Sequence, residues 1–371
     1  MTSLRLVGVL TAAAVLAAAC GGGGGDADET TTTQETTTTE APIFSSTTTT
    51  TTTTRPAATT TTTLPEAIRQ PLTGEPVASD DELITRPALA VKIDNANQAR
   101  VNHTGLAVAD IVFEEIVEDN NTRFAAVFHT NDADPVGPIR SGRSQDVDIL
   151  SSFNEPLFAW SGGNPGVTRI IRESFLTDLN AQRSPGYFRG PGSAPHDLYS
   201  STDALYEQTP EDHPGAPPIQ WNYVAANSEF AGVEVAGFDL EMRRRDITWE
   251  WNPETSRFMR IMDGEFHVDK TYGPIDATNV IVMVVEYRPS AVDARSPEAQ
   301  TLGEGLVYVF SNGELIEGKW DRTLAVAPIR FNDLDGNPIP LTPGNTWIEL
   351  AEFDGSVGEG ESPVAMIIRG R

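Results

Sequence analysis

One segment, residues 110–143, constrains the fold of this chain more than any other. It contains two apolar runs of strand length, residues 111–117 and 124–129, separated by turn-forming Asp and Asn residues. Two such runs joined by a short turn predict a β-hairpin. Carboxylates and arginines gather in the same segment, although the chain holds only 26 Lys and Arg residues against 53 Asp and Glu residues. The segment therefore also predicts an ion-paired polar site.

The sequence around this hairpin predicts a first domain of mixed α/β structure over residues 76–208. An alternating run at residues 89–95 is typical of a strand, and residues 157–160 form another short apolar run. Apolar residues recur at helical spacing in residues 144–153 and 167–179. Strands and helices in this order favour a layered structure in which helices cover a sheet.

The pattern changes after a Pro-rich segment, residues 209–219, which we interpret as an interdomain linker. Residues 220–371 contain many strand-like runs and almost no helical pattern. Asp-Gly at residues 263–264 and Asn-Gly at residues 312–313 lie between such runs, and these pairs are strong signals for β-hairpins. We therefore predict a β-rich, antiparallel C-terminal domain, which makes the fold class of the whole chain α+β.

Residues 1–20 resemble the signal peptide of a bacterial lipoprotein. An apolar run too short to span a membrane ends in small residues and then in Cys20, the one cysteine of the chain. A single cysteine cannot form an internal disulfide, and its position is where a lipid would be attached in a lipobox. Ordinary cleavage after the alanine run, with Cys20 as a free thiol, is the alternative. Residues 21–75 are rich in Gly and then in Thr, which predicts a disordered stalk.

The formal net charge of −27 disfavours nucleic-acid binding, which needs a basic face. It also disfavours adsorption to an anionic membrane, so we expect membrane attachment through the lipid on Cys20. The histidines show no metal-binding spacing, and no cofactor motif is found, so we predict neither a metal nor a cofactor. The folded part is expected on the extracytoplasmic face of the cell membrane.

Polar side chains at strand ends and turns form the candidate site. Asp94 and Asn95 lie at the tip of a predicted strand, and Glu114 and Glu118 point to one face if the hairpin is regular. His196 could act as a general base, although such a loop histidine more often bonds a backbone carbonyl. The candidate catalytic residues are Asp94, Glu114, Glu118 and His196, and the candidate ligand-binding residues are Asn95, Arg100, Arg123, Arg140 and Arg143.

Three interpretations of these residues stay open. They form a structural ion-pair network that pins the hairpin to a loop. Alternatively, the arginines bind a carboxylate or phosphate in bidentate fashion. In an enzyme, carboxylates separated by about 5 to 10 Å would act on a glycosidic bond, or Asp94 and the arginines would act on a phosphoryl group. Four tryptophans could also line a sugar-binding face or pack in the core: Trp249, Trp251, Trp320 and Trp347.

Six ordered motifs resemble those of the YerB-like family of bacterial lipoproteins. They are VKIDN (91–95), ADIVFE (109–114), TRFAAVF (122–128), GPIRSGR (137–143), SGGNP (161–165) and APHDLYSS (194–201). The resemblance continues into the second half, in RIMDGEFHVDK, ATNVIVMVVEY and GELIEGKWDR. It implies a protein with distinct N-terminal and C-terminal halves in a family of unknown function.

We expect an envelope module that binds an anionic wall component, such as a glycan polymer, or an envelope protein through its arginines and glutamates. A hydrolase or transferase that acts on glycan or phosphoryl groups with paired carboxylates is the alternative. The sequence does not decide whether the chain is an enzyme, and it identifies neither the ligand nor the oligomeric state.

Overall fold

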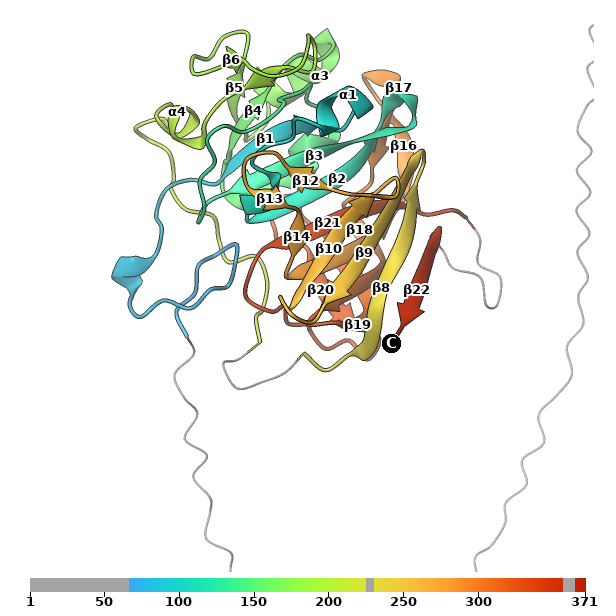
Figure 1. The fold of residues 1–371 in the computed structure, drawn as a ribbon. Coiled ribbons are helices and arrows are strands. Elements are labelled where there is room, and N and C mark those ends of the chain that lie inside the picture. Colours follow the sequence, from blue (N-terminus) through green and yellow to red (C-terminus); the bar gives the residue numbers. More distant parts are fainter. Residues whose placement is uncertain (1–66, 225–229, 356–363) are drawn as a thin grey trace, which may run out of the picture. The chain divides into compact units, whose positions relative to one another are not determined.

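The computed structural model describes residues 67–224, 230–355 and 364–371 (Figure 1). The described residues form one compact unit. The predicted signal peptide, Cys20 and most of the predicted stalk lie outside the described residues.

The fold begins before the predicted boundary at residue 76. Leu72 is fully buried in a hydrophobic core, and Arg69 pairs with Pro76 in a β-bridge. Leu72 lies between Pro71 and Gly74, and these turn-forming residues interrupt any apolar run of strand or helix length. The sequence pattern therefore does not reveal this start.

Within the described residues, sixteen strands form one continuous mixed sheet that contains strands from both halves of the chain (Figure 1). From one edge to the other, the main path is β11 (Glu265–Phe266), β10 (Arg257–Met262), β9 (Arg245–Asn252), β8 (Val233–Met242), β19 (Glu314–Arg322), β18 (Gly303–Ser311), β15 (Asn279–Val285), β21 (Thr346–Glu352), β2 (Ile111–Val117), β3 (Asn121–Phe128), β1 (Leu89–Asp94), β4 (Leu157–Trp160) and β5 (Thr177–Asn180). Off this path, β14 (Asp276–Ala277), β20 (Arg330–Asp333) and β22 (Met366–Gly370) pair with β10, β19 and β8.

Short elements complete the fold. Three two-stranded pairs are β6 (Phe188–Arg189) with β7 (Leu198–Tyr199), β12 (Val268–Asp269) with β13 (Gly273–Pro274), and β16 (Tyr287–Ser290) with β17 (Asp293–Ala299). The helices of the described residues are α1 (Asn97–Arg100), α2 (Gln145–Leu150), α3 (Pro165–Arg172) and α4 (Thr202–Tyr206), with 3-10 turns η1 (Asp80–Glu82), η2 (Leu106–Val108), η3 (Glu118–Asn120) and η4 (Ser151–Phe153). The α+β class holds, with a low helix content that is confined to the N-terminal half of the described chain.

The predicted helix at residues 167–179 is only half correct. Asn164 caps the start of α3, because its Oδ1 accepts a hydrogen bond of 2.9 Å from Val167 N. The helix ends at Arg172, and residues 177–180 form β5 beside β4. Leu179 fits both the helical period and a strand, and its burial in the core decides for the strand.

Both predicted hairpin turns are confirmed. Asp263 and Gly264 connect β10 to β11 with φ angles of 52° and 82°. Asn312 and Gly313 connect β18 to β19 with φ angles of 50° and 72°. Positive φ at both central residues matches the right-handed twist of the strands, which explains the choice of Asp-Gly and Asn-Gly.

The C-terminal half is not purely antiparallel, contrary to the prediction. Its strand β21 lies between β15 and β2 and is parallel to both. An apolar run such as residues 346–352 has no signal for its direction in a sheet, because that direction depends on a distant partner. Through β21, the two predicted domains share one sheet.

Strands β1, β2 and β3 are buried on both faces. Alternate residues enter two hydrophobic cores, with Val91 and Ala126 on one side and Ala90 and Val127 on the other. Any charged side chain in the middle of these strands is therefore removed from water and needs a partner.

Lys92 is fully buried in the middle of β1. Its Nζ donates to Asp146 Oδ1 at 2.6 Å and also to Glu115, and both acids are fully buried. Burial raises the pKa of Glu115 to about 7, and the charge of Asp146 contributes to this rise. One ammonium group thus stabilises two carboxyl groups, of which Glu115 takes up a proton near neutral pH.

Replacing Lys92 by Met is expected to lower the free energy of unfolding by about 3 to 5 kcal/mol, because two buried carboxyl groups lose their counter-charge. Glu115→Gln keeps the pair of Lys92 with Asp146 and is the matched control. Urea unfolding at about pH 8, followed by tryptophan fluorescence, measures the difference. Equal stability of the Met variant and the wild type would contradict the role of Lys92.

The contribution of Glu115 to the free energy of unfolding depends on pH. The native pKa of Glu115, about 7, lies above its ordinary value of 4.5, so the folded state binds more protons between these values. The contribution of Glu115 to stability therefore falls as the pH rises through this range. Unfolding of wild type and Glu115→Gln from about pH 5 to about pH 8 should show a steeper fall in the wild type. A smaller fall is expected in the variant too, because burial also raises the pKa of Asp110 to about 7.

Candidate functional site

Opposite charges meet on one face of the sheet, where β1 ends and β3 begins. In the strand register, Arg123 of β3 lies opposite Asp94 of β1 on one side and Glu115 of β2 on the other. Side chains of directly paired residues share a face of a sheet. The loop that follows β3 pairs with the end of β1 in an antiparallel bridge between Ile139 and Ile93, in which Arg140 N donates to Lys92 O at 2.8 Å.

Asp94 is the central acceptor of this region, and only 2% of the residue is exposed. Its Oδ2 accepts hydrogen bonds from Arg140 Nε at 3.1 Å and from His196 Nδ1 at 2.5 Å. Burial raises the pKa of Asp94, but the bonds from His196 and Ala96 N and the charges of Arg123 and Arg140 together lower it below its ordinary value. Asp94 is therefore a carboxylate at neutral pH.

Glu118 is the acceptor of a second group of ion pairs. Its Oε2 accepts from Arg143 Nε at 2.8 Å, and its Oε1 accepts from Arg123 Nη2 at 3.3 Å. Burial raises the pKa of Glu118, but the charges of Arg123 and Arg143 outweigh it and bring the pKa to about 2. Burial and the charge of Arg143 lower the pKa of Arg123 to about 10, so this arginine stays protonated at neutral pH.

Ser141, which was not among the predicted site residues, accepts hydrogen bonds from all three arginines. Its carbonyl accepts from Arg123 at 3.0 Å and from Arg143 at 3.4 Å, and its Oγ accepts from Arg140 Nη1 at 3.2 Å. The next residue, Gly142, lets the loop pack closely, because a Cβ there would lie 2.8 Å from Ile171 Cδ1. This close packing accounts for the second glycine of the GPIRSGR motif, Gly142.

The outer edge of this cluster faces solvent. The side chains of Arg140 and His196 are 24% and 18% exposed, whereas those of Arg123 and Arg143 are nearly buried. Arg140 and His196 donate to the same oxygen of Asp94, so the two partly exposed side chains meet at that carboxylate. We call the following residues the arginine site: Asp94, Glu118, Arg123, Arg140, Arg143 and His196.

Three of the predicted residues lie outside the arginine site. Glu114 and Asn95 are fully buried, and Asn95 Nδ2 donates to Glu114 Oε1 at 3.2 Å. Arg100 pairs with Asp263 at 2.6 Å instead. The predicted pairing of Glu114 with Glu118 is wrong, because the 3-10 turn η3 begins at Glu118 and ends the strand alternation there.

Glu114 belongs to a second polar cluster, which is buried between strands of the two halves. It forms an ion pair with Arg260, and Glu349 of the neighbouring strand β21 lies 3.7 Å from Arg260. Burial raises the pKa of Glu349 well above its ordinary value, and the charge of Glu114 adds to this. The sequence had no signal for this cluster, since its members are far apart in the chain.

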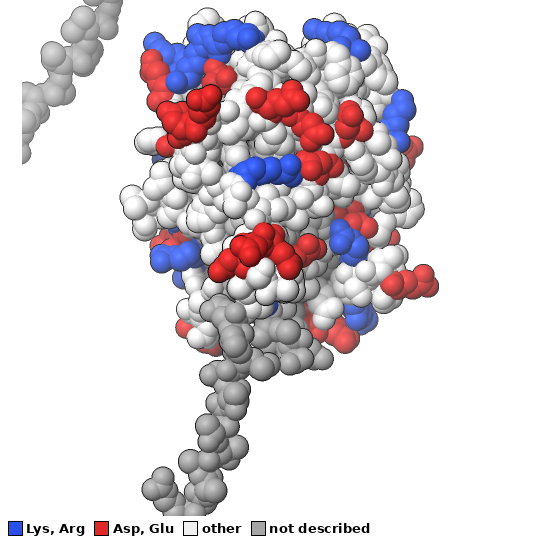
Figure 2. Space-filling model, turned by 90° about the vertical axis from the view of Figure 1, so that its left-hand side faces the viewer, with Lys and Arg blue, Asp and Glu red and all other residues white. Residues whose placement is uncertain are grey.

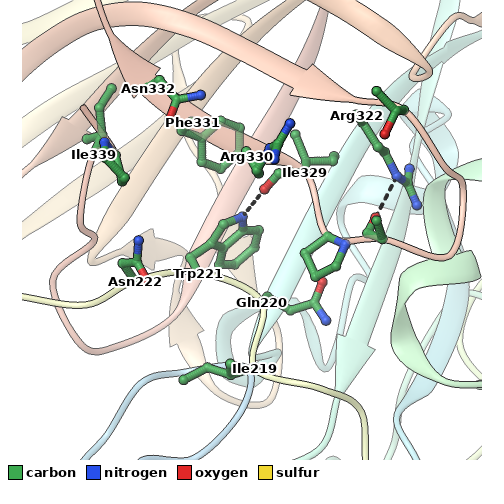
Figure 3. Close-up of a pocket in the computed structure, with 14 residues that line it drawn as sticks. Ile219, Gln220, Trp221, Asn222, Arg322, Ile329, Arg330, Phe331, Asn332 and Ile339 are labelled. Carbon is green, nitrogen blue, oxygen red and sulfur yellow. Dashed lines mark hydrogen bonds between the residues drawn. The ribbon is translucent and has the colours of Figure 1, made fainter. Parts of the chain in front are cut away.

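The burial of the four predicted tryptophans argues against a sugar-binding face. Trp249, Trp320 and Trp347 are buried in the cores, and Trp251 is half-buried. An open pocket of about 370 Å³ lies elsewhere, with Trp221 and Phe331 among its lining residues (Figure 3). Trp221 Nε1 donates to Ile329 O at 3.1 Å, so its polar atom is already used. None of the residues of the arginine site lines this pocket.

No helix in the described ranges has the length and apolar character needed to cross a membrane. Residues 67–224, 230–355 and 364–371 contain no group of three or more His, Cys, Asp and Glu side chains placed to hold a metal ion. Figure 2 shows acidic and basic side chains interspersed over one face of the molecule.

Comparisons with known proteins place the chain in a family. Residues 72–215 match the N-terminal domain, and residues 238–348 the C-terminal domain, of a protein family of unknown function, DUF3048. The chain is 26% identical over 310 residues to a Bacillus subtilis protein named "Putative lipoprotein YerB", covering 79% of this chain and 90% of that protein.

The fold is also found in a solved structure. The crystal structure of the YerB protein from Bacillus subtilis matches with a TM-score of 0.68 and 22% identity, and it covers 81% of this chain and 99% of that chain. The resemblance to the YerB-like family is thereby confirmed. The chain belongs to the DUF3048 family and contains both its N-terminal and its C-terminal domain.

Proposed function

We propose that this chain is a lipid-anchored extracytoplasmic protein that binds an anionic group of the cell envelope at the arginine site. The lipobox-like pattern at Cys20 and the name of the Bacillus subtilis relative support the location. The observation that carries the binding role is the pairing of Arg140 and His196 on one oxygen of Asp94, with the outer edges of both side chains exposed.

The charge balance of the arginine site favours an anion. Three arginines face two carboxylates, Asp94 and Glu118, whose low pKa values keep them ionised. The site therefore carries excess positive charge on a protein with a formal net charge of −27. Such a local excess in an acidic protein attracts a phosphate or carboxylate and orients it.

The arginines have different roles in this proposal. Arg123 and Arg143 are nearly buried and bond Glu118 and backbone carbonyls, so they build the site. Arg140 uses Nε on Asp94 and Nη1 on Ser141 and presents its remaining N–H groups to solvent. Arg140 is therefore the residue that contacts the ligand.

Replacing Arg140 by Ala is expected to lower retention on isolated cell-wall material about 10-fold, because a charge-assisted hydrogen bond to the ligand is lost. Retention should also fall as salt is added. Pull-down across a salt titration measures both effects. Arg288→Ala is the control, since Arg288 is 65% exposed and pairs with Glu286 outside the site. Retention that is equal in the two variants contradicts the proposal and directs the search to protein partners.

Replacing Glu118 by Gln tests the structural role of the inner arginines. The native pKa of Glu118, about 2, lies below its ordinary value of 4.5, so its contribution to stability is present above 4.5 and is lost as the pH falls toward 2. At neutral pH, the variant is expected to lose about 1 to 3 kcal/mol of unfolding free energy. Urea unfolding at neutral pH and at about pH 3 should show a smaller difference under acid. A difference that grows with acidity would exclude these ion pairs as its source.

A second function, hydrolysis of the bound group, is favoured by one observation. Asp94 bonds Nδ1 of His196, which fixes the ring and leaves Nε2 on the partly exposed side, as in a proton-transfer dyad. In hydrolysis of a phosphate ester, Nε2 would take a proton from the attacking water as the new phosphorus–oxygen bond forms. The bond from phosphorus to the leaving alkoxide would break, and the His196 imidazolium would return that proton to the alkoxide. Asp94 would thus act through His196, and the arginines would stabilise the developing negative charge.

This second function predicts new product masses when the protein is incubated with cell-wall material. His196→Gln should reduce product formation by about 100-fold or more, because general-base catalysis is lost. His213→Gln, in a separate loop, is the control. Mass spectrometry of the supernatant detects any products. Retention of the protein without products supports a binding module and contradicts the hydrolase function.

A further inference from the structure

Two side chains hold the backbone at the tip of β1, which carries Asp94. One is His103, which His267 of the C-terminal half (residues 230–371) supports, and the other is Arg245 of that half. Asp94 O accepts a hydrogen bond from His103 Nε2 at 2.6 Å. Asn95 O accepts one from Arg245 Nη2 at 3.0 Å. Two consecutive carbonyl groups are thus held by side chains, and they set where the Asp94 carboxylate lies.

His103 is itself held by a chain of hydrogen bonds with a fixed direction. Arg260 Nη1 lies 2.9 Å from His267 Nδ1, and His267 Nε2 lies 2.8 Å from His103 Nδ1. A guanidinium group only donates, so His267 Nδ1 must accept and His267 Nε2 must carry the hydrogen that it donates to His103. His103 Nε2 then donates to Asp94 O. The chain works with both histidines neutral, and burial lowers the pKa of His103 to about 4 and that of His267 well below 6.5.

Arg260, the start of this chain, cannot move away easily. It is fully buried, it pairs with Glu114, and its guanidinium group lies 4.8 Å from the ring centre of Trp347. Glu114 lies on β2, two strands from β1 in the sheet. The chain of hydrogen bonds therefore starts from a point fixed by both halves and ends at the strand tip of the arginine site.

Arg245 makes a second, direct connection. Besides Asn95 O, its Nη1 donates to Asn97 Oδ1 at 2.8 Å and its Nε to Asn121 Oδ1 at 3.1 Å. It joins the tip of β1 to the start of β3, where Arg123 follows two residues later. Only 7% of Arg245 is exposed, so its bonds are shielded from water.

We propose that Arg245 and His267 of the C-terminal half are positioning residues for the arginine site: they hold the tip of β1 so that Asp94 can align Arg140 and His196. The affinity of the N-terminal site then depends on the C-terminal half, although that half contributes no residue to the site. The effect on affinity rests on the proposed function, whereas the positioning of Asp94 does not.

The test uses conservative variants of the full chain, Arg245→Lys and His267→Gln. Lys keeps the charge of Arg245 but loses its planar fork, and Gln keeps a hydrogen-bonding group at one end of the imidazole. The first readout is the chemical shift of the His196 ring in a ¹H–¹³C NMR spectrum, which reports its contact with Asp94 and needs no ligand. The second is retention on cell-wall material.

We expect the His196 resonances to shift in both variants and retention to fall about 10-fold, the usual effect of removing a group that orients a binding residue. Arg369→Lys is the control, because Arg369 bonds Trp249 O and Glu250 within the C-terminal half. It should change neither readout. Folded variants with unchanged His196 resonances would overturn the proposal.

Two further outcomes are separated by this design. If the wild type is not retained on cell-wall material but the His196 resonances shift in the variants, the positioning role is supported and the proposed ligand class is contradicted. If Arg245→Lys does not fold, Asn121→Ala removes an acceptor of Arg245 at a half-buried position and makes the same NMR test. Unshifted resonances in that variant would count against the positioning role of Arg245.

Discussion

The parallel pairing of β21 with β2 is the contact on which the rest of the structure depends. It places residues 346–349 beside residues 111–114, so a strand from late in the chain completes the sheet of the N-terminal half. The pairing also brings Glu349 next to Glu114, and Arg260 lies between the two carboxyl groups. Both the continuous sheet and the buried polar cluster follow from this one long-range contact.

The charged side chains of this protein lie in two different environments. Lys92 and Arg260 are fully buried, and each faces two carboxyl groups of which one has a raised pKa. Burial makes a second unpaired negative charge costly, so a proton is retained instead. In the arginine site, by contrast, several cations surround Asp94 and Glu118, and both pKa values are lowered. The buried clusters are therefore suited to stability, and the cation-rich site to an incoming anion.

The structural interpretation fits the inner residues of the arginine site, and the proposed binding role rests on the outer ones. Arg123 and Arg143 form the ion-pair network that pins the hairpin to the following loop, because both bond Glu118 and Arg123 also bonds the carbonyl of Ser141. Arg140 and His196 lie at the edge of that network and remain partly exposed. A rigid inner layer that presents a few exposed donors is the arrangement expected of a preorganised binding site.

The sequence by itself determined the local structure: the hairpin of β2 and β3, the strand that ends at Asp94, the turns at Asp263 and Asn312, and the grouping of arginines with acids. Each depends on residues close together in the chain, where alternation and turn preference act directly. Only the tertiary structure decided that Glu114 faces Arg260 while Glu118 faces Arg143, and that β21 inserts parallel to β2. These outcomes depend on partners more than a hundred residues away or on where a strand ends, and a single sequence has no periodic signal for either.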